Sequence, residues 1–277
     1  MTPSHTNTSR NGYGINVFAL NDDPVKRWHA LVTIYSRLKL TYESDRLPAI
    51  AAVVEREIEV RSGGVYIAGM WSNSVLKDLS WVTSYGSNFS RPCVQVPTWA
   101  WPATKDGVVW SKRDQVLPSL ALVDLSFTRV WPVHVGEVKD ASVTLRGVTY
   151  TANISDFRKS RYGSPTSFDI HVPPDAKLPF KDSDSYPDFD WKAAEPPVSV
   201  GDMFLILMIS IETGAPKRPC HTLCGLILRE VTRDVFEKMG RVVMYYDRRD
   251  YEQGPDWEDR FHHDLVGSLP IREVKII

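Results

Sequence analysis

The chain has 277 residues, of which 43% are hydrophobic, and this length and composition suit one large globular domain or two modest ones. Lys and Arg number 33 against 34 Asp and Glu, so the formal net charge is -1. Without a positive field, neither nucleic acid nor an anionic membrane is a favoured partner. The longest apolar run, 203–209, is far shorter than the roughly 20 residues needed to cross a bilayer, so we expect no membrane span.

The first 21 residues are rich in Ser, Thr, Asn and Gly and lack the apolar stretch of a secretory signal. We therefore expect a disordered leader over 1–21 and an intracellular, cytoplasmic protein. Three cysteines, Cys93, Cys220 and Cys224, are too few and odd in number for a disulfide framework, which agrees with a reducing compartment.

A first helix is predicted from Pro24 to about Leu38. Asp23 can cap it, and a proline at the first helical position loses no intrahelical hydrogen bond. Trp28 and Val32, among other apolar residues, recur at helical spacing in this segment.

The stretch 35–53, YSRLKLTYESDRLPAIAAV, contains a charged cluster directly before a proline. Asp45 and Arg46 could form a catalytic acid and an orienting base, but a helix start accounts for both residue types. With Asp45 as the N-cap, Pro48 falls in the first turn, where no hydrogen bond is lost. We therefore predict a helix that runs to about Val60 and stops at the glycines 63 and 64. Its predicted buried face is apolar: Leu47, Ile50, Val54 and Ile58.

The segment 65–71, VYIAGMW, reads as a buried strand, and a short helix follows that Ser72 or Asn73 can cap. In an extended segment, Trp99 and Trp101 would share one face, where they could stack on a sugar, a small molecule or a cation. The alternative is a pair of core aromatics. The core interpretation is favoured because no cluster of polar side chains accompanies the pair.

From 113 to 277 the pattern changes to short segments rich in Val, Ile, Thr and aromatic residues, separated by turn residues. We expect a β-rich half, either a sandwich or an open barrel, after a helical and mixed segment over 22–112, which makes the fold class α+β. A proline-rich and acidic stretch, 173–197, reads as a long irregular surface insertion. Strands are predicted at 131–138, 141–145, 149–154, 167–172, 204–211, 223–231, 241–246 and 271–277.

Cys220, His221 and Cys224 form the single cluster of cysteine and histidine in the sequence. Their spacing is not that of a usual zinc-binding pair, and a fourth ligand would have to come from a distant part of the chain. We therefore predict no metal site and no cofactor.

The segment DWEDRFHHDL places a carboxylate four residues before each of His262 and His263, with Glu258 and Asp259 as the partners. One helical face could then present carboxylate and imidazole together, as a hydrolase would require. A solvated amphipathic helix explains the same pattern and is favoured, because the residue order of a zinc protease helix is absent.

Three blocks of the sequence, 35–53, 63–81 and 96–110, closely resemble the segment that follows the signature domain in fungal heterokaryon incompatibility (HET) proteins. The family strings run approximately Tyr-Ser-x-Arg-x-Leu-Thr, Asp-Arg-Leu-Pro-Ala-Ile-x-Gly, Tyr-Leu-Ala-Gly-Leu-Trp and Ala-Pro-Ser-Trp-Ser-Trp-Ala-Ser with a later Asp-Gly. The first two strings fall in 35–53, and all four appear here in the same order. The segments 138–147 and 224–231 follow in the expected succession, so the resemblance covers about 24–277.

The chain departs from the family at Leu38, Ala52 and Pro102, where the family has a basic residue, glycine and alanine. A larger departure concerns the incompatibility domain itself, which resembles a Toll/interleukin-receptor fold and is linked to cell death. Its blocks, a Tyr-x-Ala-Leu-Ser-Tyr-x-Trp-Gly run and an Ile-Asp-x-Leu-Cys-Ile-x-Gln run, do not occur in this chain. The death-related activity is therefore not carried over.

The resemblance implies a non-enzymatic accessory region, either a truncated product or a stand-alone paralogue. Its expected role is recognition of self or of a partner protein, or restraint of a HET-type signalling domain supplied by another chain. Two alternatives remain: a carbohydrate- or small-molecule-binding β module that uses Trp99 and Trp101, and a hydrolase that uses His262 or His263.

Overall fold

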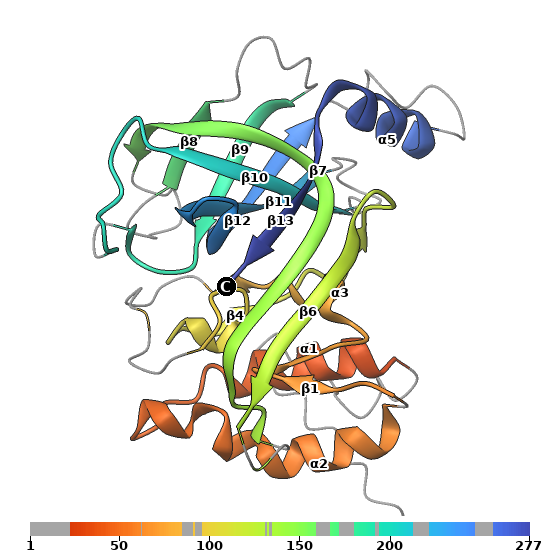
Figure 1. The fold of residues 1–277 in the computed structure, drawn as a ribbon, viewed down its shortest axis with the longest axis vertical. Helices are drawn as coiled ribbons and strands as arrows, with labels where there is room; N and C mark the ends of the chain where they lie inside the picture. The colour runs from red at the N-terminus through yellow and green to blue at the C-terminus, as the bar shows by residue number, and fades with distance from the viewer. Residues whose placement is uncertain are drawn as a thin grey trace, which may run out of the picture.

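The computed structural model describes residues 23–61, 63–84, 91, 96–130, 132, 135–158, 167–171, 180–191, 194–212, 222–246 and 257–277. The helices of the N-terminal part gather at one end of the molecule, and a large, mostly antiparallel sheet follows, with one C-terminal helix at the opposite end (Figure 1). The α+β prediction is therefore confirmed. The expected leader, 1–21, and the residues Cys93, Cys220 and His221 lie outside the described residues. In the part of the chain that the structure describes, no helix is long and apolar enough to cross a membrane.

The N-terminal region, 23–110, consists of short elements. Its helices and strands are α1 (Pro24–Tyr35), η2 (Glu43–Arg46), η3 (Pro48–Ile50), α2 (Ala51–Val60), β1 (Tyr66–Ile67), β2 (Met70–Trp71), α3 (Val75–Asp78), β3 (Val82–Thr83), η4 (Trp101–Ala103) and β4 (Val108–Val109). The strands form two small antiparallel pairs, β1 with β2 and β3 with β4.

The predicted start of α1 is confirmed. The Asp23 carboxylate accepts hydrogen bonds from the backbone N–H groups of Val25 and Lys26, at 3.0 and 3.1 Å, and so satisfies two donors of the first turn. The helix ends at Tyr35 rather than at Leu38.

The predicted cap at Asp45 is wrong. Asp45 lies inside the 3-10 helix η2, and α2 begins only at Ala51, with no side-chain cap. The reason lies in the neighbouring Arg46, whose buried guanidinium donates to the backbone oxygens of Lys105 and Asp106, a constraint that local capping rules do not contain. Pro48 occupies the first position of η3, where its missing N–H is tolerated.

The buried face of α2 was predicted correctly at Leu47, Ile50 and Val54, which are buried. It was wrong at Ile58, which is 43% exposed. The two 3-10 segments η2 and η3 precede α2 and have fewer residues per turn than an α-helix, so a single α-helical period does not hold across 46–60.

The segment 65–71 is a tight hairpin rather than the single predicted strand. Ala68 and Gly69 form its turn with φ values of 50° and 90°. Positive φ at both loop residues is typical of a two-residue hairpin. A side chain at Gly69 would also collide with the indole nitrogen of Trp101. The helix α3 starts after Ser74, without the predicted cap from Ser72 or Asn73.

The C-terminal region forms a barrel. Its elements are β5 (Asp114–Val116), β6 (Ala121–Arg129), β7 (Val138–Arg158), β8 (Ser167–His171), β9 (Phe180–Pro187), β10 (Met203–Glu212), β11 (Thr222–Thr232), β12 (Val235–Tyr246), α5 (Trp257–Ser268) and β13 (Ile271–Ile276). The strand pairings run β10, β11, β12, β13, β7 and back to β10, so they close on themselves.

One long, strongly curved strand, β7, makes this closure (Figure 1). Its first half pairs with β13 up to Val148, and its second half pairs with β10 from Thr149 onward. The change of partner occurs beside Gly147, where an added Cβ would lie 3.0 Å from side-chain atoms of Leu120 and Leu207. The strand thus merges two segments that were predicted as separate.

Two other sequence predictions change in this half, and the short strand β5 was missed as well as β6. The predicted strand 131–138 is not formed at residues 132 and 135–137, and the remaining part before Val138 lies outside the described residues. The irregular insertion expected over 173–197 contains β9, which pairs with β12 and leads to the buried Trp191, so that expectation is wrong for 180–191.

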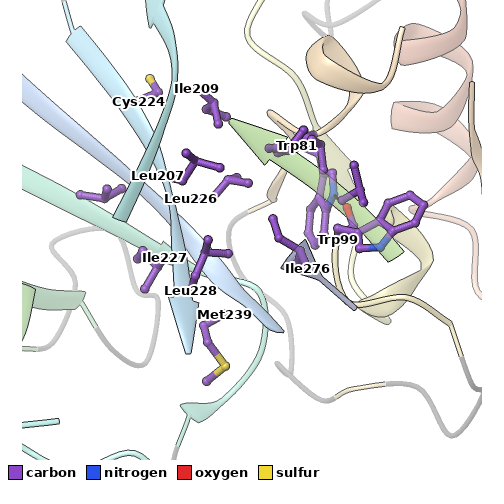
Figure 2. Packing of buried hydrophobic residues seen from close by; sticks show 14 of the residues in the cluster. Trp81, Trp99, Leu207, Ile209, Cys224, Leu226, Ile227, Leu228, Met239 and Ile276 are labelled. Carbon is purple, nitrogen blue, oxygen red and sulfur yellow. Dashed lines mark hydrogen bonds between the residues drawn. The ribbon is translucent and has the colours of Figure 1, made fainter. Parts of the chain in front are cut away.

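One hydrophobic core joins the two regions. The indole N–H of Trp81 donates to the backbone oxygen of Trp99 at 2.9 Å, and Figure 2 shows the Trp81 ring beside Ile276 of β13. Side chains of the N-terminal region therefore complete the packing of the barrel.

Candidate functional site

A cavity of about 380 Å³ lies where the N-terminal region meets the barrel. Its wall is formed by α1, by residues 76–80 at α3, by residues 110–116 and by Ser210 of β10. Its volume falls within the range of small-molecule sites, which is about 300–1,000 Å³. This is the strongest candidate site in the described part of the chain.

An aromatic pair with fixed orientation stands in the wall. The ring of His29 stacks on Trp110, with centroids 4.4 Å apart and planes inclined by 4°. His29 Nε2 lies 2.7 Å from a carboxylate oxygen of the fully buried Asp78, and the Trp110 N–H donates to the Asp78 backbone oxygen at 2.9 Å. Asp78 is held in turn by donors from the backbone of Trp71 and the hydroxyl of Ser74. Both rings are therefore preorganised.

A β-bulge directs Ser210 to the cavity. The register of β10 with β11 shifts between Met208 and Ser210, while Leu117 N–H donates to the backbone oxygen of the intervening Ile209. Ser210 is 2% exposed, and its hydroxyl oxygen has no hydrogen-bond partner among the described residues. A buried hydroxyl without a partner is uncommon in folded proteins, so this one is a polar group still open to a ligand.

The charged side chains around the cavity do not balance. Asp23 caps α1 and lies 3.1 Å from the ammonium of Lys26, and Asp114 is paired with an arginine. Lys77 and Lys112 stand exposed at the rim, and neither ammonium has an ion-pair partner within the described ranges. The uncompensated charge at the cavity is therefore positive.

A second polar cluster lies behind the wall, at Asp114. Arg241 Nη2 lies 3.0 and 2.9 Å from the two carboxylate oxygens of Asp114. Glu212 and Cys224 complete a group whose potential ligand atoms all lie within 4.8 Å of one another. Burial raises the pKa of the Asp114 carboxyl, and Glu212 acts in the same direction while Arg241 opposes it. Because the guanidinium already supplies the positive charge that a metal ion would bring, the donor set does not fit a metal site.

A third cluster contains a buried ion pair. Lys238 Nζ lies 2.6 Å from Asp188 and 3.3 Å from the centre of the Trp81 ring. Burial lowers the pKa of Lys238 to about 8, and burial raises the pKa of the Asp188 carboxyl. Both side chains are buried and neither lines the cavity, so the pair has a structural role. It joins β12 to the residue that follows β9, and the contact of Lys238 with Trp81 connects it to the N-terminal region.

The tryptophans singled out in the sequence lie in the core. Trp99 and Trp101 are both 0% exposed. Trp101 belongs to the 3-10 helix η4, so the expected extended segment is not formed, and its indole N–H donates to the backbone oxygen of Gly69 at 2.7 Å. A stacking platform needs an exposed ring face, which neither residue has. The structure therefore places both in the core, as the favoured interpretation held.

The other sequence candidates are dispersed. Cys224 is buried in β11, and the other members of its cluster, Cys220 and His221, lie outside the described residues. His263 is exposed and lies 3.7 Å from Asp264 rather than from Asp259.

His262 completes the set of histidines in α5, and its Nε2 is buried and without a hydrogen-bond partner in the described part of the chain. Among the described side chains of α5, neither histidine forms a pair with the carboxylate four residues before it, and the side chain of Glu258 lies outside the described residues.

Sequence reasoning missed His29 and its partner Asp78, and also Trp110 and Ser210; all but Asp78 line the cavity. The first two are 49 residues apart, and no motif spacing connects them. The single usable signal was a polar residue inside an apolar strand, Ser210, which departs from the continuous hydrophobic pattern of 203–209.

We compared the chain with protein-family models, with curated proteins and with solved structures, and none of them matches it.

Proposed function

We propose that this chain is a non-enzymatic accessory region of a HET-type protein, which recognises another protein or restrains a signalling domain supplied by another chain. The proposal rests on the resemblance of its sequence blocks to the region after the HET domain. One structural observation supports it: these blocks contact one another.

The contacts between the four strings are specific hydrogen bonds. The Tyr35 hydroxyl donates to the backbone oxygen of Arg46 at 2.8 Å. Arg46 donates to the backbone oxygen of Asp106 at 3.0 Å and lies over the ring of Trp101, which donates to Gly69. The four strings of the resemblance therefore form a single packing unit. Tyr35, Arg46 and Trp101 are thus used in internal contacts, as expected of a framework rather than of a catalytic centre.

The same blocks expose apolar side chains on the outside of the N-terminal region. Leu38 is 56% exposed and Tyr42 is 66% exposed. Ile34, Ile58 and Val60, from α1 and α2, are also exposed. Exposed apolar side chains that adjoin one another are typical of protein-binding surfaces, so Leu38 and Tyr42, four residues apart, are the first candidates to bind a protein partner. A cytoplasmic location fits the proposal, because the described Cys224 is a free thiol.

The test uses a purified HET domain supplied as a separate chain. We expect it to associate with this chain in sedimentation at micromolar concentrations, and coexpression of the two in a fungal host should change the frequency of cell death. The double variant Leu38→Gln/Tyr42→Ser should weaken both effects, since it alters exposed residues and leaves the core intact.

Val200→Gln is the matched control, because it removes an equally exposed apolar side chain from a loop before β10. It should leave association unchanged. If no association is measured and the death frequency stays the same with folded wild-type chain, the accessory role is wrong.

A further inference from the structure

We infer that the cavity between α1 and the barrel binds a small organic anion, with an apolar body inside the cavity and the anionic group at the rim beside Lys77 and Lys112. This inference is independent of the HET resemblance, since it rests on geometry and charge alone.

The interior of the cavity suits an apolar body. Val25 and Ala30 of α1, Leu76 of α3, Val116 of β5 and Trp110 line it, and apolar atoms contribute most of the surface that faces the cavity. A volume of about 380 Å³ admits a molecule built on one aromatic ring with a short substituent. Burial of such a ring against these side chains supplies the nonspecific part of the affinity.

Two polar side chains of the cavity, Ser210 and His29, are held in fixed positions. The Ser210 hydroxyl is buried without a partner, and the bulge in β10 holds its position. His29 is held by Asp78 through Nε2, and its ring plane is fixed against Trp110. A small number of positioned polar groups in a mainly apolar wall is the usual composition of a small-molecule site.

The sign of the ligand charge follows from the pairing of the charged residues. The two carboxylates at the wall are already neutralised, Asp23 by Lys26 and by backbone donors, and Asp114 by Arg241. A cationic ligand would find no free carboxylate among these described wall residues. The ammonium groups of Lys77 and Lys112 remain to bind phosphate, sulfonate or carboxylate, which they do through charge-assisted hydrogen bonds.

The test is a charge series on one ring: phenyl phosphate, benzoate, phenol and benzylamine, titrated into the full chain by calorimetry. We expect the two anions to bind, phenol to bind about tenfold more weakly, and benzylamine not to bind. Comparison of phenyl phosphate with benzoate distinguishes a phosphate ligand from a carboxylate ligand.

Variants locate the site. Lys77→Gln and Lys112→Gln should each weaken phenyl phosphate by about tenfold and leave phenol unchanged. Lys275→Gln, at an exposed lysine of β13 away from the cavity, is the matched control and should change nothing. Ala30→Leu should fill the cavity and abolish binding of every ligand.

Circular dichroism and thermal unfolding establish that each variant is folded, and if Ala30→Leu fails to fold, Thr33→Leu fills the same cavity from a less buried position. NMR signals of the His29 ring should shift with phenyl phosphate in the wild type and not in the filled variant. The inference is overturned if phenol binds as tightly as the anions, if no ligand of the series binds, or if a folded filled variant still binds.

Discussion

The backbone polar groups of the N-terminal region and those of the barrel find their hydrogen-bond partners in different ways. In the barrel, strands such as β11 and β12 pair over almost their whole length, so neighbouring strands satisfy one another. In the N-terminal region the strands have two residues each, and distant side chains provide the partners. Trp28 and Trp101 both donate to the backbone oxygen of Gly69, for example. Local sequence patterns are therefore informative for the barrel and much less so for the N-terminal region.

The largest loss of stability is expected from a substitution that disrupts the tryptophan packing of the N-terminal region. Trp101→Ala removes a fully buried ring and the donor to Gly69, and we expect it to lower the free energy of unfolding by about 4 kcal/mol. Denaturant unfolding measures this value. Because one core joins the two regions, fluorescence and circular dichroism should report a single transition. A variant whose barrel unfolds separately, at unchanged denaturant concentration, would contradict this coupling.

The next effect concerns the Lys238–Asp188 ion pair of the barrel, which contacts the N-terminal region through Trp81. Lys238→Met leaves the Asp188 carboxylate buried without its partner, and we expect a loss of about 3 kcal/mol in the free energy of unfolding. Adding Asp188→Asn should restore most of that loss, since no buried charge then remains. If the double variant is as unstable as the single one, the pair contributes through packing rather than through charge.

The alkaline pH dependence of the stability tests the burial of Lys238. The pKa of Lys238 is about 8 in the folded protein and 10.5 ordinarily, so between these values the unfolded chain binds more protons. The free energy of unfolding should therefore rise with pH in this window, by at most about 1.4 kcal/mol per pH unit.

The double variant Lys238→Met/Asp188→Asn lacks this rise and serves as the reference. It keeps Tyr66 and Tyr150, whose pKa values burial raises and whose contribution to stability is lost above pH 10 in both proteins. Parallel stability curves for the wild type and the double variant between pH 8 and 10 would show that Lys238 does not titrate there.

The smallest effects are expected at Asp23 and Asp45, two aspartates that the sequence predicts as helix N-caps. Asp23→Ala removes an observed cap and should cost about 1 kcal/mol. Asp45→Ala removes a carboxylate that caps nothing and should change stability by less than about 0.5 kcal/mol. Thermal unfolding of both variants at neutral pH checks the difference. Equal losses at both positions would mean that Asp45 stabilises the segment in a way that its position in η2 does not show.

The fold was predictable where burial follows a local period. The strands expected at 204–211 and 223–231 lie within β10 and β11, because a fully buried strand shows a continuous run of apolar residues. β9 was missed, since prolines and acids surround it and its pairing with β12 uses backbone groups that no side-chain pattern reveals.

The candidate site was hardly predictable. Its residues come from α1, α3, the segment 110–116 and β10, and each has an ordinary local explanation when taken alone. His29 reads as a polar residue in an amphipathic helix, and Asp78 reads as a residue near a helix end. Only their contact at 2.7 Å, beside a cavity, makes them a candidate.

The sequence by itself determined the α+β class, the start of α1 and most strands of the barrel, because capping and hydrophobic periodicity act over a few neighbouring residues. The tertiary structure decided the burial of Trp99 and Trp101, the role of Arg46 and the existence of the cavity. These features depend on contacts between segments tens of residues apart, and such contacts leave no period in the sequence.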